Sequence, residues 1–216
     1  MNSRNPFTPA TLIALAVSVP AVALSLPPMR SLIEQSMVWH MVIQMPLLVL
    51  GGWLSMSAMS HTRASQLLTS WNRYGLTGFF TAQAIVAYWM LPLAVDRAVV
   101  LPQTDLLKVM TLFACGFMLK HSFERSPAVL QLFFVGYAVS MMTWLGVYFA
   151  TTELRLCNAY SLQGQAEAGR GVVLLAWGLG CAWLVAQSGK CPASRVSADI
   201  KLLHAETHST HRASRN

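Results

Sequence analysis

Six long apolar segments follow one another along the chain, separated by short polar stretches. They cover residues 9–26, 36–59, 75–95, 105–119, 127–150 and 171–187. Roughly 20 apolar residues cross a bilayer, and backbone polar groups in lipid must be satisfied within a helix. The pattern therefore predicts an all-α, polytopic transmembrane helical bundle with six spans, which together form one domain over residues 1–189.

The two ends of the chain differ from this pattern. The first segment could be a cleaved signal peptide, because Arg4 precedes it and "ALS" before Leu26 resembles a cleavage site. Its apolar stretch is longer than that of most signal peptides, which favours a retained helix. Residues 190–216 are polar and are expected to form a flexible cytoplasmic tail. The tail carries His204, His208 and His211 at helical spacing, which suits either a metal or an unstructured segment.

Lysine and arginine predict the orientation. With the N-terminus inside, ten of the fifteen basic residues lie on the inner side and five lie in outer loops. The outer set is Arg30, Arg97, Lys108, Arg155 and Arg170. This bias favours six spans with both ends in the cytoplasm. Because the excess of +7 follows the expected topology, it does not indicate binding to nucleic acid. Only 11% of residues are charged, against about 25% in soluble domains.

The second segment opens with the stretch "MVWHMVIQM", whose polar and sulfur-bearing residues recur at helical spacing. They are Met37, His40, Met41, Gln44 and Met45. On a helix these positions share one face. On the predicted topology this face lies in the outer half of the membrane, as do most of the chain's twelve methionines. Neutral thioethers and an imidazole suit Cu(I), and they are cheaper to bury in lipid than carboxylates. The alternative is that these methionines only fill space.

Other polar residues in the segments have structural interpretations. Gln83 and Gln131 are expected to bond between helices, and Pro46 is expected to kink its helix with local repair of hydrogen bonds. His121 lies at the opposite end of the membrane from His40, which is too far for the two to bind one metal or clamp one haem. The sequence has no phosphate-binding loop, nucleophile elbow or zinc-protease helix, and we expect no enzymatic activity.

Three stretches resemble the CtaG family of copper-associated cytochrome c oxidase assembly factors. They are "HMVIQMPLLVLG" (His40–Gly51), "WMLPLAVDRAVVLPQTDLLKVMTLFACG" (Trp89–Gly116) and "GQAEAGRGVVLLAW" (Gly164–Trp177). The resemblance extends from about Met37 to Gln187, in a chain shorter than the usual seven-span members. Gln44 stands at the second histidine of the first motif. Asp105, Lys108 and Val109 occupy the stretch of a His-x-x-Glu-His pattern, and Gly164 replaces an aspartate.

The resemblance implies a membrane factor, or chaperone, for cytochrome c oxidase assembly or copper delivery in the bacterial inner membrane. Its partners would be the lipid bilayer, with oxidase subunits or a periplasmic copper protein. The candidate Cu(I) ligands are His40, Met41 and Met45, with Met37 as an auxiliary. Two alternatives remain: an accessory structural subunit of a respiratory membrane complex, or a small-molecule or ion transporter. A transporter usually needs an ionisable group near the midplane, and the hydropathy pattern places none there.

Overall fold

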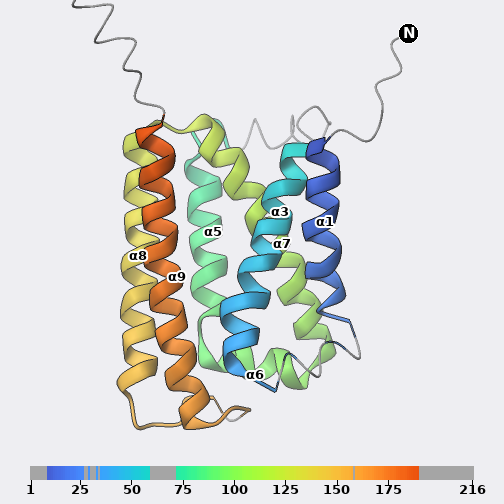
Figure 1. The fold of residues 1–216 in the computed structure, drawn as a ribbon, viewed down its shortest axis with the longest axis vertical. Helices are drawn as coiled ribbons and strands as arrows, with labels where there is room; N and C mark the ends of the chain where they lie inside the picture. The colour runs from blue at the N-terminus through green and yellow to red at the C-terminus, as the bar shows by residue number, and fades with distance from the viewer. Residues whose placement is uncertain are drawn as a thin grey trace, which may run out of the picture. The chain divides into compact units, whose positions relative to one another are not determined.

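The computed structural model describes residues 9–26, 29, 33, 35–58, 72–157 and 159–189. All regular structure in these residues is helical, as predicted (Figure 1). The elements are α1 (Pro9–Ala23), the π-helix η1 (Trp39–Gln44), α3 (Met45–Ala58), α5 (Leu76–Trp89), α6 (Pro92–Val100), α7 (Pro102–Arg125), α8 (Ala128–Thr151) and α9 (Leu162–Ser188). The predicted tail, with its three histidines, lies outside the described residues.

The chain divides into two units, Met1–Leu179 and Gly180–Asn216. Within the second unit the structure describes only the end of α9, where the Ser188 hydroxyl donates a hydrogen bond to the Val185 carbonyl oxygen over 2.8 Å. All the sites discussed below lie in the first unit.

Four helical segments are long and apolar enough to cross a membrane: Trp39–Met56, Pro102–Arg125, Ala128–Thr151 and Leu162–Ser188. Helices α5 and α6 meet the same test as a pair but bend by 72° at the break between them. Helix α1 is apolar but shorter. The described residues therefore form a helical protein with four or five candidate spans, as expected of a membrane-embedded chain.

The third predicted segment, residues 75–95, is not one continuous helix. Helix α5 ends at Trp89, and α6 begins at Pro92 in a new direction. A residue before proline is driven out of the helical region, and Leu91 is extended, with φ −72° and ψ 129°. Proline then suits the first position of the new helix, where no N–H is needed. The prediction missed this break because hydropathy alone continues through it.

Two other boundaries were also wrong. The fourth segment was predicted as residues 105–119, but α7 is 24 residues long and starts at Pro102. The sixth segment was predicted to begin at residue 171, but α9 begins at Leu162 and includes residues 162–170, which the pattern left between the fifth and sixth segments. Both helices extend into polar sequence, which a hydropathy window does not score as part of a span.

Helix α3 packs between α1 and α7, and α7 also contacts α5 and α6 (Figure 1). The predicted interhelical role of the two glutamines is confirmed. The Gln83 amide donates to the Phe134 carbonyl oxygen over 2.9 Å, which joins α5 to α8. The Gln131 amide donates to the Phe123 and Ser126 carbonyl oxygens, which joins α8 to the end of α7. These contacts hold the helices around the buried polar residues described next.

Candidate functional site: a sulfur face beside a buried ion pair

The predicted stripe in the second segment forms one buried face. Met37, His40, Met41, Gln44 and Met45 are all buried, and His40 has no exposed surface. Trp39 and Ile43, on the opposite side, are 58% and 42% exposed. Helical periodicity thus placed these five side chains correctly. We call the three thioethers Met37, Met41 and Met45 the sulfur face.

The backbone that carries Met41, the middle residue of the sulfur face, is the π-helix η1, which ends at Gln44, two residues before Pro46. The Met45 N–H donates to the His40 carbonyl oxygen, a bond across five residues. Pro46 has no N–H to offer and its ring crowds the preceding turn, so widening this turn relieves the helix. The predicted adjustment at Pro46 therefore takes the form of a π-helix, a feature frequent at functional sites.

A buried ion pair lies against the sulfur face. The Lys108 ammonium is 2.7 Å from the Asp105 carboxylate, and the Lys108 side chain is fully buried. Its Nζ atom is also 3.4 Å from Nε2 of His40. Since an ammonium only donates hydrogen bonds, the imidazole accepts at Nε2 and carries its proton on Nδ1. We call Asp105, Lys108 and His40 the ion-pair cluster.

The placement of Lys108 in an outer loop was wrong. Lys108 lies inside α7, one turn after Asp105, and both side chains point into the protein. The spacing of three residues puts the two charges on one helix face. Ionisable groups inside a membrane protein are costly to keep and usually functional. This pair is the main feature that the hydropathy analysis missed, and its i, i+3 spacing was the available signal.

Gln44 ties this region to the end of α1. Its amide nitrogen donates to the Ser25 hydroxyl over 3.1 Å and approaches the Leu24 carbonyl oxygen at 3.5 Å. Its buried Oε1 atom has no hydrogen-bond partner among the described residues. Gln44 therefore offers one neutral oxygen acceptor within the same buried stripe as His40.

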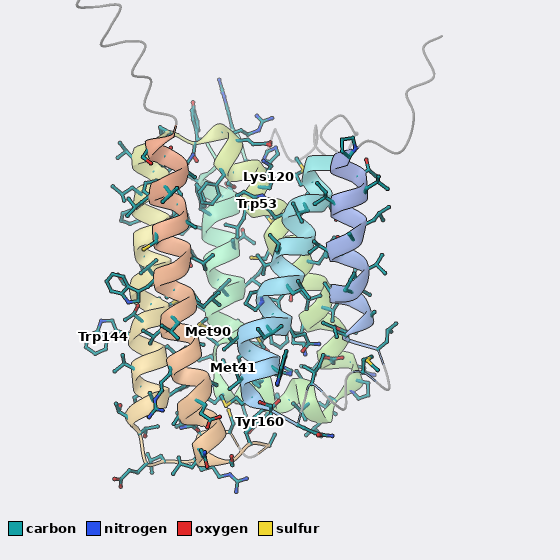
Figure 2. The ribbon with its side chains drawn as sticks, in the orientation of Figure 1. Met41, Trp53, Met90, Lys120, Trp144 and Tyr160 are labelled. Atoms are coloured by element: carbon teal, nitrogen blue, oxygen red, sulfur yellow. The ribbon has the colours of Figure 1, made fainter. Side chains whose placement is uncertain are left out.

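The loop between α8 and α9 covers the cluster. The ring of Tyr160 lies 6.4 Å from that of His40, between ring centres. Gln165 holds this loop in place, because its side chain accepts from the Leu156 N–H over 2.9 Å and donates to the Leu154 carbonyl oxygen over 3.2 Å. Figure 2 shows Tyr160 and Met41 toward the same end of the helices. Tyr160 of this loop thus lies beside His40, one member of the ion-pair cluster.

Cys157 lies in this same loop and is buried in the apolar cluster that contains the sulfur face. Burial, together with the nearby Asp96 carboxylate, raises the pKa of the Cys157 thiol to about 12. A thiol in this state is unreactive, because the thiolate is the nucleophile and the metal ligand. Its burial is not evident from the sequence, where Cys157 falls in the polar stretch between the fifth and sixth apolar segments.

We expect Cys157 to react slowly with a maleimide at pH 8 when the other three cysteines are replaced by serine. A thiol with a pKa of 12 is ionised in only roughly one molecule in ten thousand at that pH. The same background with Cys157→Ser and Ser161→Cys provides an exposed control, which should react at least ~100-fold faster. Equal rates would contradict the burial. The Cys157 thiol has a pKa near 9 in the unfolded chain and about 12 in the folded protein. Ionisation therefore favours the unfolded state, and the free energy of unfolding should fall as the pH rises from about 9 toward 12.

The methionines that the predicted topology assigns to the outer half of the membrane do not form one layer. The sulfur face belongs to one apolar cluster, whereas Met142 lies in another, with Met90 and Met141 packed against it. Met110 is 64% exposed on α7. Met90 and Met142 are therefore poorer candidates to replace a lost ligand than the other members of the sulfur face.

His121 is held separately from His40, as predicted. Its Nδ1 atom is 3.1 Å from the Asn72 amide, which also donates to the Ser122 hydroxyl over 2.8 Å. The Asn72 side-chain oxygen accepts from the Gly78 N–H at the start of α5. Figure 2 shows Lys120, the neighbour of His121, toward the opposite end of the helices from Met41. This network joins α7 to the start of α5.

No protein family, curated protein or solved structure matches this chain. Among the described residues, no three side chains of His, Cys, Asp or Glu form a group suited to a metal ion. The fold and site define an all-helical protein with apolar helices of membrane-spanning length and a buried ionic cluster beside three thioethers.

Proposed function

We propose that the six apolar segments are six spans, with the α5–α6 pair as one bent span and both ends of the chain in the cytoplasm. Lys108 lies within α7 rather than in an outer loop, and of the other outer basic residues Arg97 lies in α6 and Arg170 in α9. The ten basic residues assigned to the inner side still outnumber the outer ones, which favours this orientation. Helix α1 has 15 residues and is about 22 Å long, so it would need a locally thinner bilayer or a few further residues. Reporter fusions at the two ends would test this; a periplasmic C-terminus would refute it.

We propose further that the chain is a membrane factor for cytochrome c oxidase assembly or copper delivery in the bacterial inner membrane. The observation that carries this proposal is the burial of three thioethers and one imidazole on a single face. The resemblance to the CtaG family supplies the oxidase connection. Oxidase subunits or a periplasmic copper protein are the proposed partners.

The donors of the sulfur face fit Cu(I) better than any other metal. Thioethers are soft and neutral, and Cu(I) binds such ligands in preference to oxygen donors. Neighbouring methionines of the sulfur face are four residues apart, which is about 6 Å along a helix. Two neighbours can therefore bind one ion more easily than Met37 and Met45, which lie at the two ends of the face. Met41 is adjacent to both of the others and is the proposed central ligand.

His40 fits less well as a copper ligand through Nε2, since this atom faces the Lys108 ammonium at 3.4 Å. Its Nδ1 atom would have to lose a proton to another site before it bound a metal. The proposed copper site is therefore built mainly on thioether sulfur, and His40 contributes only if the contact with Lys108 changes. Metal content of His40→Ala against wild type would measure this contribution.

The variant Met41→Leu with Met45→Leu should lose most of the copper retained by the wild type after anaerobic purification with Cu(I). The exchange of methionine for leucine keeps the volume and usually costs less than about 1.5 kcal/mol, so the apo protein should keep its thermal stability. Met56→Leu is the matched control, because Met56 is also buried on α3 but lies two turns or more from Met45. Full copper retention by the double variant would leave the methionines as packing residues.

Deleting the gene should lower cytochrome c oxidase activity, most clearly when copper is scarce. The same strain carrying the double methionine variant should remain deficient, whereas the Met56→Leu variant should restore activity. Unchanged oxidase activity in the deletion strain at low copper would contradict the proposed function, whatever the protein binds in vitro.

A small-molecule or ion transporter is the second candidate, and the ion-pair cluster favours it. Asp105 and Lys108 are buried ionisable groups of the kind used by coupled carriers. Uptake assays in vesicles with wild type and Lys108→Met would address it. Stoichiometric co-purification with a respiratory complex in mild detergent, without copper, would instead support an accessory subunit.

A further inference from the structure

The ion-pair cluster holds two donors of the kind that bind divalent metal ions, and an ammonium lies close to both. Carboxylate oxygen and imidazole nitrogen both bind divalent metal ions. Here the Asp105 oxygen is 2.7 Å from Nζ of Lys108, and Nε2 of His40 is 3.4 Å from the same atom. One positive group thus faces both donors, which come from two different helical segments.

A divalent metal ion cannot share this position with Lys108. Zinc binds imidazole nitrogen at about 2.0 Å, so an ion on the line from Nε2 to Nζ would lie about 1.4 Å from Nζ. The ammonium also has no lone pair with which to bind a metal. Its charge would repel the ion, and the repulsion is strong where water is excluded. Lys108 therefore excludes the metal both by its volume and by its charge.

We propose that Lys108 is a specificity-determining residue that closes the Asp105–His40 position to divalent metal ions. This inference goes beyond the proposed function, since it concerns Zn²⁺ and related ions at nitrogen and oxygen donors. It holds whether or not the sulfur face binds Cu(I). In a copper-handling protein, Lys108 would make this region selective for Cu(I) over divalent ions. The soft thioethers remain available to Cu(I), whereas the neighbouring carboxylate and imidazole are already paired with Lys108.

The test is the zinc content of full-length Lys108→Ala, purified without a histidine tag and equilibrated with Zn²⁺. This variant removes the charge and opens space beside Asp105 and His40. We expect more bound Zn²⁺ than in the wild type, up to about one equivalent, with water completing the two protein donors, and Co²⁺ should give a ligand-field spectrum that the wild type lacks. Comparison with the wild type removes any contribution from the tail histidines, which are the same in every variant.

Two controls separate the site from general effects. Lys108→Arg retains a positive charge and should bind no additional zinc. The double variant Lys108→Ala with His40→Ala should lose the additional equivalent, because it lacks the imidazole. Zinc should also raise the melting temperature of Lys108→Ala, since a ligand that binds only the folded state stabilises it. The double variant should show no such increase.

Lys108→Gln provides a second test if Lys108→Ala folds poorly. Its amide can still donate to Asp105, so the carboxylate keeps a partner, but the positive charge is gone. It should also bind more Zn²⁺ than the wild type. The proposal is overturned if neither variant gains zinc, or if the wild type itself binds Zn²⁺ through His40. Neither result bears on Cu(I) retention at the sulfur face, which is measured separately.

Discussion

Replacing Asp105 by alanine should lower the free energy of unfolding by about 3–5 kcal/mol, as is typical when one partner of a buried ion pair is removed. The Lys108 ammonium is fully buried, and its carboxylate partner is only 2.7 Å away. In this variant, the buried ammonium would lose its carboxylate partner and keep the imidazole of His40, which carries no compensating negative charge. We expect a large fall in the melting temperature of the detergent-purified protein.

Helix α7 offers a matched control for this prediction. Lys120 and Glu124 form an ion pair of 3.1 Å on the same helix, but there the side chains are 24% and 47% exposed. Exposed pairs are worth about 0–1 kcal/mol, so Glu124→Ala should change stability little. Similar losses in the two variants would show that burial does not strengthen the Asp105 pair.

A double replacement separates the contribution of the Asp105–Lys108 pair to protein stability from its contribution to function. Buried ion pairs are often replaced by apolar residues without loss of stability, so Asp105→Leu with Lys108→Met should be more stable than Asp105→Ala alone. If this double variant folds and still supports oxidase activity in the deletion strain, the charges serve stability and selectivity rather than the function itself. Loss of function in a folded variant would place the charges in the working site.

Hydropathy and helical period together predicted the helical elements and the buried face. The apolar residues of α8 predicted that helix to within a residue, and the spacing of Met37, His40 and Met41 predicted their shared burial. Both predictions depend on local sequence, because a helix fixes the relation between residues three or four apart. Where the local signal was mixed, as at Pro92 or at the start of α9, the predicted boundary failed.

The composition of the site could not be obtained from local patterns in the same way. Tyr160 and Cys157 reach the sulfur face from a loop more than a hundred residues later in the chain. Lys108 was counted among the basic residues of the outer loops, because it lies near the start of the fourth predicted segment. Asp105 on α7 and His40 on η1 offset the cost of burying its charge, and the contact with His40 depends on how the helices pack.

The packing of α3 against α7 leads to the second large effect. Gly116 on α7 faces α3, and a Cβ atom at this position would overlap the Val49 carbonyl oxygen and lie 2.9 Å from the Trp53 backbone nitrogen. Both obstacles are backbone atoms, which cannot rotate away. Gly116→Ala should therefore force the helices apart and cost about 1–3 kcal/mol or more. Small residues at such crossings are what allow membrane helices to approach closely.

Gly136→Ala on α8 is the control, because a Cβ atom there meets nothing within 4 Å. Alanine is the better helix former by up to about 1 kcal/mol, so this variant should be as stable as the wild type or more so. Thermal unfolding of both proteins in one detergent would give the comparison. If Gly116→Ala is as stable as Gly136→Ala, the close approach of α3 and α7 does not contribute to stability.

The effect of Gly116→Ala should extend to the ion-pair cluster. Helix α7 carries Asp105 and Lys108, while His40 lies on the π-helix that leads directly into α3. The α3–α7 crossing therefore controls the 3.4 Å contact between Lys108 and His40. Widening the crossing should weaken that contact, and the double variant Gly116→Ala with Lys108→Ala should bind Zn²⁺ more weakly than Lys108→Ala alone. Equal zinc affinity in the two would show that the cluster is positioned independently of the crossing.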